Sequence, residues 1–359
     1  MNEAQFKPLS YSNNVEKGSV SWQAPSNIAL VKYWGKYGEQ LPKNASLSFT
    51  LDKCHTVTTL TYEKKQGNDF QFELFLDGKQ EPSFEPKILQ FFNRVEAFLP
   101  FLQEYKFRID TSNSFPHSSG IASSASGMSA LALCLMSLEE SLCDGEMTMD
   151  YFRQKASFLA RLGSGSACRS IEGNLIVWGE HPKISGSNNL FGIKFPNSVH
   201  ENFKNYQDTI LLVDTGEKEV SSTVGHGLMH GHPFAEQRFT QANENLSKLI
   251  SIFESGDLSE FIKIVESEAL SLHAMMLTSQ PYFILMKPNT LEIINRIWSF
   301  RKASGSSVCF TLDAGANVHV LYPEIEKEMV SEFIRNELAT FCKDGKFIQD
   351  QIGFGAVQK

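Results

Sequence analysis

The chain has 359 residues, of which 42% are hydrophobic and 21% charged, so it can bury a core for one large or two ordinary domains. Its formal net charge of −8 argues against a nucleic-acid partner held by bulk electrostatics, although local cations and helix N-termini can still bind a small anion. The apolar stretches are too short to span a membrane, the N-terminus lacks a secretory-signal pattern, and the six cysteines form no CxxC pair. We therefore expect a cytoplasmic protein with reduced thiols and no membrane partner.

The first 200 residues predict a mixture of strands and helices. Short alternating runs predict strands, whereas apolar residues spaced three or four apart predict helices. Asp77-Gly78 follows one alternating run and is a strong hairpin signal, because both residue types tolerate a positive φ. The predicted strands are Val20–Gln23, Thr56–Tyr62, Phe70–Leu76 and Phe107–Asp110, and the predicted helices are Pro86–Leu99 and Ser126–Glu139.

From about Asn202 the pattern is mainly helical. The predicted helices are Pro233–Glu254, Leu258–Leu277, Thr290–Ala303 and Glu324–Leu338, and the predicted strands are Thr209–Val213, Val308–Leu312 and Val318–Tyr322. Strands and helices are mixed without a regular βαβ order, which favours an α+β fold. We expect two domains, residues 1–199 and 200–359, divided within a Gly/Asn/Ser-rich region.

The first motif that carries chemistry is Pro116–Gly127, which reads PHSSGIASSASG. Small residues let backbone amides approach a ligand closely, and the segment leads into a predicted helix whose N-terminus favours a phosphate. Ser123 and Ser124 add hydroxyls that could reach a phosphate oxygen or Mg²⁺. The alternative is a flexible loop with a serine N-cap. The motif is not a Walker A sequence, since no GK[ST] follows, but its spacing resembles the phosphate loop of the GHMP kinase superfamily.

The second motif is Ala24–Lys36, which reads APSNIALVKYWGK. Lys32 and Lys36 flank Tyr33, so the segment can offer cations and a hydroxyl to a multiply charged anion. Taken alone, KYWGK could equally be the end of an amphipathic strand with surface lysines. Together with the following LPKNASLSFTL, it closely resembles the opening signature of the diphosphomevalonate decarboxylases within that superfamily.

The third motif is Arg161–Ser170, which reads RLGSGSACRS. Glycines and serines allow a tight turn, and Arg169 carries a planar fork suited to a carboxylate or phosphate. A linker with a surface arginine is the alternative, which the apolar flanking residues disfavour. We interpret Cys168 as a small packing residue, because no neighbour in the sequence suggests an activated thiolate. This motif resembles the same family.

The fourth motif is Phe310–Asn317, which reads FTLDAGAN. An aspartate where a strand meets a glycine turn is held by rigid backbone, as a general base or charge stabiliser should be, although most such residues simply make a turn. The family has DAGPN here, and its aspartate is the catalytic carboxylate. Ala316 replaces that proline, which we expect to loosen the turn while leaving Asp313 in place.

A weaker match covers Lys218–Gly225, where Ser222 corresponds to a substrate-binding serine of the family. The family usually continues with Met, whereas this chain has His226. His226, His230 and His232 also suggest a metal site, because histidines four apart on a helix can share an ion. The glycines between them weaken such a helix, so we consider a metal here the minor alternative.

The resemblance covers nearly the whole chain and implies the two-domain GHMP kinase fold. That fold has an N-terminal domain similar to ribosomal protein S5 domain 2, a C-terminal α/β sandwich domain, and an active site in the cleft between them. The implied reaction is ATP-dependent, Mg²⁺-assisted decarboxylation of (R)-5-diphosphomevalonate to isopentenyl diphosphate in isoprenoid biosynthesis, and the implied assembly is a homodimer. Alternatives are a mevalonate-type 3-kinase, a monophosphate-specific decarboxylase, or a catalytically silent ligand-binding regulator.

The resemblance also assigns candidate site residues by role. The catalytic candidates are Asp313, Arg169, Lys32 and Asn27; the substrate-binding candidates are Tyr33, Lys36, Ser164, Ser166 and Ser222; and the ATP-binding candidates are Ser119, Gly120, Ala122, Ser123 and Ser124. Of these, Ser124 is also the candidate for contact with Mg²⁺.

Overall fold

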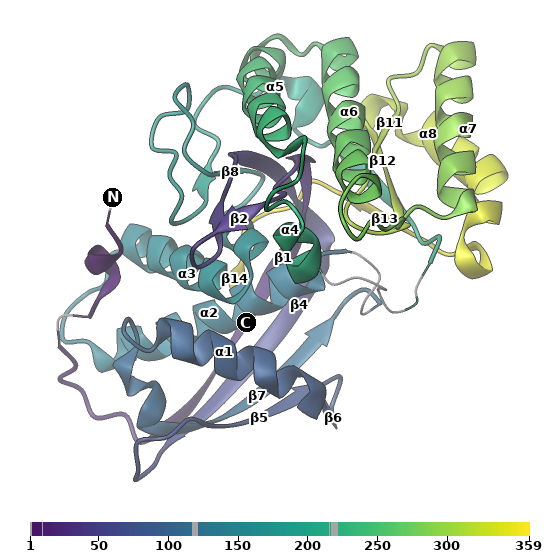
Figure 1. Cartoon of the computed structure of the whole chain (residues 1–359). Helices are drawn as coiled ribbons and strands as arrows, with labels where there is room; N and C mark the ends of the chain where they lie inside the picture. Colours follow the sequence, from purple (N-terminus) through teal and green to yellow (C-terminus); the bar gives the residue numbers. More distant parts are fainter. Residues whose placement is uncertain (1, 9, 117–120, 215, 217–221) are drawn as a thin grey trace.

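The computed structural model describes residues 2–8, 10–116, 121–214, 216 and 222–359, arranged as two halves (Figure 1). The N-terminal half, purple to teal, is built on a large twisted sheet, and the C-terminal half, green to yellow, combines long helices with a smaller sheet. In the part of the chain so described, no helix is both long and apolar enough to cross a membrane.

Two long antiparallel strands, β1 (Lys17–Val31) and β4 (Ser46–Lys64), form the centre of the larger sheet. Its order is β14-β1-β4-β7-β5-β6, and β8, which also pairs with β9, joins the first residues of β4. The register between β1 and β4 shifts between Pro25 and Asn27, since a proline inside a strand needs such an irregularity. The other strands are β5 (Gln71–Leu76), β6 (Lys79–Gln80), β7 (Tyr105–Asn113), β8 (Leu175–Trp178), β9 (Ile193–Lys194) and β14 (Val357–Gln358), while β2 (Lys36–Tyr37) and β3 (Leu41–Pro42) pair separately.

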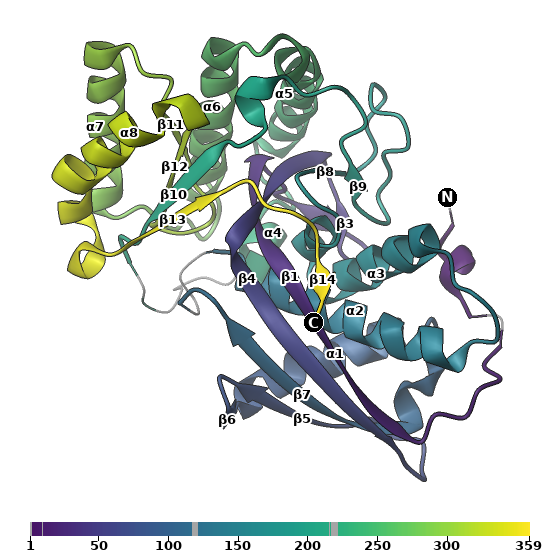
Figure 2. The same ribbon diagram turned by 180° about the vertical axis from the view of Figure 1, so that it is seen from behind.

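Three helices, α1 (Glu85–Val95), α2 (Ser123–Leu142) and α3 (Met149–Gly163), cover one face of this sheet (Figures 1 and 2). Helix α2 is apolar or small over most of its surface, so it can be buried between the sheet and its neighbours. Figure 2 shows the opposite face without helices, consistent with the alternating buried and exposed residues in the second half of β4.

The C-terminal half holds the second sheet, in the order β11-β12-β10-β13. Its strands are β10 (Gln207–Leu211), β11 (Cys309–Thr311), β12 (Val318–Tyr322) and β13 (Phe347–Gln351), and its helices are α4 (Ser222–Gly227), α5 (Ala235–Ser255), α6 (Leu258–Leu277), α7 (Pro288–Ser304) and α8 (Lys327–Phe333), which continues as a π-helix over Ile334–Leu338. Adjacent residues Ile210 and Leu211 of β10 enter different apolar clusters, so both faces of this sheet are covered.

Short 3-10 helices connect several of these elements. They span Glu3–Phe6, Pro82–Phe84, Pro100–Gln103, Gly165–Ser170, Glu201–Phe203, Glu324–Glu326, Ala339–Phe341 and Lys343–Gly345. The one over Gly165–Ser170 contains the last six residues of the third sequence motif.

The two halves share an apolar core. Phe49 of β4 packs in one cluster with Ile210 of β10, Phe253 of α5 and Phe261 of α6. Residue Gln23 of β1 also pairs with Val357 of β14, so the chain returns to the first sheet after β13, the last strand of the second sheet. A continuous apolar contact resists relative movement of the halves and fixes the groups on either side of it.

The α+β prediction is confirmed, and the predicted helix Leu258–Leu277 and strand Val318–Tyr322 coincide with α6 and β12. The predicted helix Pro86–Leu99 is too long, since α1 ends at Val95. Helix α3 is not among the predicted elements, although Thr148 caps it by accepting a hydrogen bond from the Tyr151 amide.

Candidate active site

A cavity of about 760 Å³ lies where the two halves meet. Among the described residues its wall carries the cations Lys32, Lys36, Lys87 and Arg169, and the carboxylates Glu81 and Asp313. Positive groups thus outnumber negative ones here, in a chain whose net charge is −8. The local charge suits an anionic ligand.

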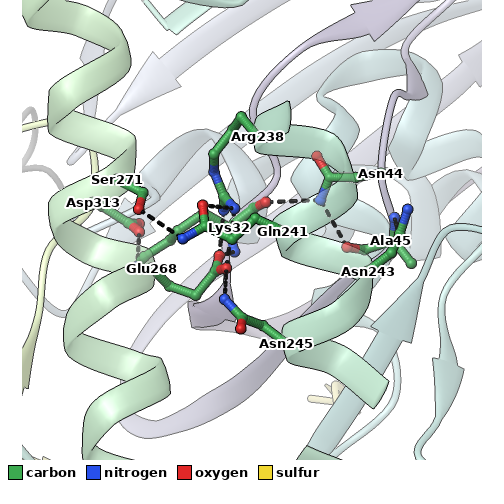
Figure 3. Close-up of polar contacts among 10 residues, drawn as sticks. All are labelled: Lys32, Asn44, Ala45, Arg238, Gln241, Asn243, Asn245, Glu268, Ser271 and Asp313. Atoms are coloured by element: carbon green, nitrogen blue, oxygen red, sulfur yellow. Dashed lines mark hydrogen bonds and ion pairs between the residues drawn. The ribbon is translucent and has the colours of Figure 1, made fainter. Parts of the chain in front are cut away.

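An ion pair across the cavity joins the two halves. Lys32 follows the last residue of β1, and its Nζ lies 3.0 Å from Oδ1 of Asp313 (Figure 3). The Lys32 side chain is 2% exposed and that of Asp313 27%, so the carboxylate is the more accessible partner. Burial lowers the pKa of Lys32, and the charge and hydrogen bond of Asp313 oppose that shift.

The turn that carries Asp313 is held by its neighbours. The Gly315 amide donates to the Asp313 carbonyl at 2.7 Å, and the Thr290 hydroxyl donates to the Ala316 carbonyl at 2.7 Å. The side-chain oxygen of Asn317 accepts from the Asp214 amide. These bonds fix the turn although alanine replaces the proline of the family motif.

Arg169 lies in the 3-10 helix Gly165–Ser170 and is 3% exposed. Its Nη1 donates to the Ser46 hydroxyl at 2.6 Å, while its Nε has no hydrogen-bond partner among the described residues. Burial lowers the pKa of Arg169, and Cys168, Asp313 and Tyr33 oppose that shift. A buried guanidinium with a spare donor in a cavity wall suits an anionic ligand group.

The Tyr33 hydroxyl is buried and likewise has no partner among the described residues. A Cβ on Gly165 would lie 2.7 Å from this hydroxyl, so glycine is required for the close approach. The ring of His226 lies 4.2 Å from that of Tyr33 and 4.6 Å from that of Trp34, and its Nδ1 accepts from the Gly35 amide at 3.0 Å. His226 therefore orders the KYWGK segment from the C-terminal half.

The other predicted substrate residues occupy different positions. Lys36 lines the cavity and donates to the Gln40 side chain at 2.8 Å, and Ser164 and Ser166 also line it. Asn27 does not line the cavity; its amide donates to the Ser170 hydroxyl at 2.8 Å and so lies beneath the 3-10 helix. The same amide also donates to the Ser166 carbonyl at 3.3 Å, so Asn27 contacts one of the substrate-binding candidates from behind the cavity wall.

The start of α2 forms another part of the wall. Ala122, Ser123 and Ser124 line the cavity, and Ala122 has a left-handed backbone with φ of 47°. The first amides of this 20-residue helix have no helical acceptor, so they can bind an anion. Ser119, Gly120 and the Ser222 side chain lie outside the described residues.

The three histidines of the possible metal motif have separate environments. His226 bonds the Gly35 amide, Nε2 of His232 lies 3.1 Å from the Met275 carbonyl, and His230 is exposed. Within the described ranges, no group of three or more His, Cys, Asp or Glu side chains could hold a metal ion.

Family models match both halves of the chain. One for the diphosphomevalonate decarboxylase-like N-terminal domain matches residues 24–189, and one for the mevalonate 5-diphosphate decarboxylase C-terminal domain matches residues 209–353. The diphosphomevalonate decarboxylase of Aspergillus fumigatus is 30% identical over 328 residues, covering 87% of this chain and 78% of that protein. The chain belongs to the diphosphomevalonate decarboxylase family.

Other members of the family are similar over most of their length. The human diphosphomevalonate decarboxylase is 27% identical, covering 88% of this chain and 79% of that protein. The crystal structure of mevalonate diphosphate decarboxylase from Staphylococcus aureus is 27% identical with a TM-score of 0.80, covering 96% and 98% of the two chains. A structure of MDDEF in complex with MVAPP, AMPPCP and magnesium is 29% identical with a TM-score of 0.79, covering 95% and 98%. These similarities confirm the two-domain GHMP kinase fold.

Several residues at this cavity have no signal in the sequence motifs. Lys87 of α1 and Leu272 of α6 line the cavity, and His273 of α6 contacts the Asp313 backbone. Each is a single residue on a helix, so no local pattern distinguishes it. Only the packing of α1 and α6 brings these residues to the site.

We expect Ser124→Ala to raise the ATP concentration needed for half-maximal rate roughly ten- to hundredfold while sparing the second substrate. Its hydroxyl lies at the start of α2 on the cavity wall, 3.4 Å from the Ser164 hydroxyl. One lost hydrogen bond to a charged group costs roughly 1.5–3 kcal/mol. Steady-state titration with ATP measures the effect, and Ser123→Ala tests the neighbouring candidate in the same wall. A normal Ser124 variant beside an impaired Ser123 variant would reverse their ranking.

We expect acidification to destabilise the fold through His226. Burial, and then Lys36 and Arg169, lower its pKa to about 3, so the unfolded state takes up a proton below about pH 6.5 while the folded state does not. Stability is therefore lost as pH falls from 6.5, by about 2 kcal/mol between pH 7 and 5. Asparagine can still accept a hydrogen bond from the Gly35 amide but does not titrate. His226→Asn should therefore remove this pH-dependent loss of stability, as measured by urea unfolding at pH 7 and pH 5. An unchanged pH dependence would contradict a buried neutral His226; exposed His230→Asn is the control.

Proposed function

We propose that this protein converts (R)-5-diphosphomevalonate and ATP into isopentenyl diphosphate, ADP, phosphate and CO₂. The observation that carries this proposal is the cavity that combines the Lys32–Asp313 pair with the buried Arg169 guanidinium. The family members include structures described with MVAPP and an ATP analogue, which supports the same pair of substrates here.

At the reacting end, Asp313 is proposed to face the tertiary 3-hydroxyl. ATP first transfers its γ-phosphoryl group to this hydroxyl, with release of ADP and of the hydroxyl proton, because a tertiary alcohol is a poor leaving group. Departure of the phosphate builds positive charge at C3, and the Asp313 carboxylate stabilises that charge while Lys32 holds the carboxylate in place. Arg169 grips the substrate carboxylate, whose C–C bond then breaks to release CO₂ and leave the alkene.

At the other end, Tyr33, Lys36, Ser164 and Ser166 are proposed to bind the diphosphate, together with Ser222. The Tyr33 hydroxyl, which has no hydrogen-bond partner within the ranges that the structure describes, and the Lys36 ammonium offer donors to phosphate oxygens. Asn27, which lies behind the wall, is proposed to act indirectly by holding the 3-10 helix through Ser170.

ATP is proposed to bind at the start of α2. Ala122, Ser123 and Ser124 line the cavity there, and Ser119 and Gly120 precede them in the sequence. The hydroxyl of Ser124 suits a Mg²⁺ ion held mainly by phosphates and water, since Mg²⁺ prefers hard oxygen ligands. When bound, the ion supplies neutralisation of the charge that develops on the transferred phosphoryl group.

The purified protein should be incubated with ATP, Mg²⁺ and each mevalonate phosphate while ADP and CO₂ are followed separately. Release of equal amounts of ADP and CO₂ when the diphosphate is the substrate supports the proposal. ADP without CO₂ would instead identify a 3-kinase, and preference for the monophosphate would identify the narrower decarboxylase. Absence of both products would favour a ligand-binding regulator.

We further propose a cytoplasmic homodimer with domains at residues 1–199 and 200–359. Six free cysteines support a reducing compartment, and family matches that end at residue 189 and resume at residue 209 support the division. The dimer is inferred from the family resemblance. Light scattering after size exclusion would measure the oligomeric state directly.

A further inference from the structure

A buried polar network lies directly behind Lys32 (Figure 3). The Glu268 carboxylate of α6 is 0% exposed and accepts hydrogen bonds from Arg238 of α5, from the Asn245 amide at 2.6 Å and from the Lys32 backbone amide at 2.8 Å. The Lys32 amide comes directly after β1, where ladder pairing has ended, so Glu268 supplies the acceptor that the sheet no longer provides.

The carbonyl of Lys32 is held from the opposite side. The Asn44 side-chain amide donates to this carbonyl at 3.0 Å and to the Ala45 carbonyl at 2.7 Å. Both backbone polar groups of Lys32 thus bind buried side chains, one from each half of the molecule. This leaves the Lys32 backbone little freedom to move relative to α6.

Helix α6 also contacts the partner of Lys32. His273 Nε2 lies 3.1 Å from the Asp313 carbonyl, and because a carbonyl only accepts, this nitrogen carries the proton. Burial lowers the pKa of His273 to about 4, so the ring stays neutral near pH 7. Glu268 and His273 lie on one rigid helix, and they bind the backbones of Lys32 and Asp313 respectively.

Stability alone does not account for this arrangement. A buried Arg–Glu pair loses the hydration of both charges, and apolar residues of similar volume often stabilise a protein as well or better. A charged acceptor of fixed position, however, can orient a neighbouring backbone group accurately. The pair lies where such accuracy affects two functional side chains.

We propose that Glu268 and His273 are positioning residues for the decarboxylation. Helix α6 sets the separation of the Lys32 ammonium and the Asp313 carboxylate by holding the two backbones, and Arg238 fixes the Glu268 carboxylate for that purpose. This inference rests on the proposed function, because it assumes that the Lys32–Asp313 pair performs the chemistry.

The test compares two buried ion pairs in the same protein. Arg238→Met with Glu268→Leu removes both charges together with the acceptor for the Lys32 amide. Lys155→Met with Glu139→Leu removes the equally buried pair between α3 and α2, neither residue of which lines the cavity, and is the matched control. Thermal unfolding, KM for each substrate and kcat for CO₂ release are measured for both.

We expect the Arg238/Glu268 variant to lose at least tenfold in kcat with KM for ATP within threefold, and the control to keep kcat within twofold. If the two double variants had equal kcat values, each calculated per amount of folded protein, the proposal would be overturned. A wild-type protein that releases no CO₂ would instead overturn the proposed function, so the two failures are distinguishable.

A second comparison remains informative if the double variant does not fold. His273→Leu removes the donor to the Asp313 carbonyl, whereas His273→Gln retains an N–H donor on a side chain of similar reach. We expect a several-fold or larger loss of kcat in the leucine variant, and recovery of most of it in the glutamine variant. Wild-type kcat in the leucine variant, or equal losses in both, would overturn the positioning role.

Discussion

Replacing Asp313 by asparagine is expected to reduce CO₂ release by at least about 10³-fold, within the range lost when a single catalytic group is removed. The substitution is nearly isosteric but leaves the buried Lys32 ammonium without its carboxylate, 3.0 Å away in the wild type. The charge that would stabilise C3 as its phosphate departs is lost as well. Binding of ATP and diphosphomevalonate should change little, because Asp313 makes no proposed contact with either phosphate group.

Single-turnover release of CO₂ would measure this loss, with calorimetry for both substrates. Asp344→Asn, at an exposed aspartate of the C-terminal half, is the control for loss of one negative charge. Near-normal turnover of the Asp313 variant would exclude this turn as the catalytic centre.

Replacing Arg169 by lysine is expected to keep substrate binding within about tenfold, roughly 1.4 kcal/mol, yet to lower decarboxylation about 100-fold or more. A guanidinium can hold a carboxylate through two parallel hydrogen bonds, whereas an ammonium supplies a single charged point. Orientation matters because the breaking C–C bond must align with the orbital that empties at C3. Ser46 already fixes one edge of the Arg169 fork, and lysine cannot reproduce that geometry.

Calorimetry would follow binding of diphosphomevalonate, and CO₂ release would follow the rate. Ser46→Ala is a useful second variant, because it keeps the guanidinium and removes the hydroxyl that orients it, together with the hydrogen bond from that hydroxyl to the Trp178 carbonyl. A smaller loss of rate is expected. Collapse of binding with a normal rate at saturation would show that Arg169 anchors the substrate and has no role in the chemistry.

Much of the site can be predicted because its residues lie in short motifs. KYWGK, GSGSACRS and FTLDAGAN place Lys32, Arg169 and Asp313 in distinctive local sequences, and the structure brings all three to one cavity. Their distances could not be predicted, since Lys32 and Asp313 are 281 residues apart and meet only through the shared core.

The residues that sequence analysis misses have another kind of environment. Glu268 and His273 look like ordinary polar positions of a long helix, and their burial depends on how α6 packs against β1. Asn27 is the opposite case, because its motif is distinctive but its side chain lies behind the cavity wall. The β1–β4 register shifts between Pro25 and Asn27, next to this side chain. Motifs therefore identify candidates, whereas side-chain direction depends on strand irregularities that sequence alone does not reveal.

The return of the chain to the first sheet has a consequence for biosynthesis. Trp22 and Gln23 of β1 pair with Gln358 and Val357. A Cβ on Gly353 would lie 2.4 Å from the Leu51 carbonyl, so the C-terminal segment passes close to β4 of the first sheet. While the ribosome is still making the C-terminal half, that edge of β1 has no partner, and an unpaired strand edge can recruit another chain. The N-terminal sheet therefore completes its pairing only when residues 357 and 358 have emerged.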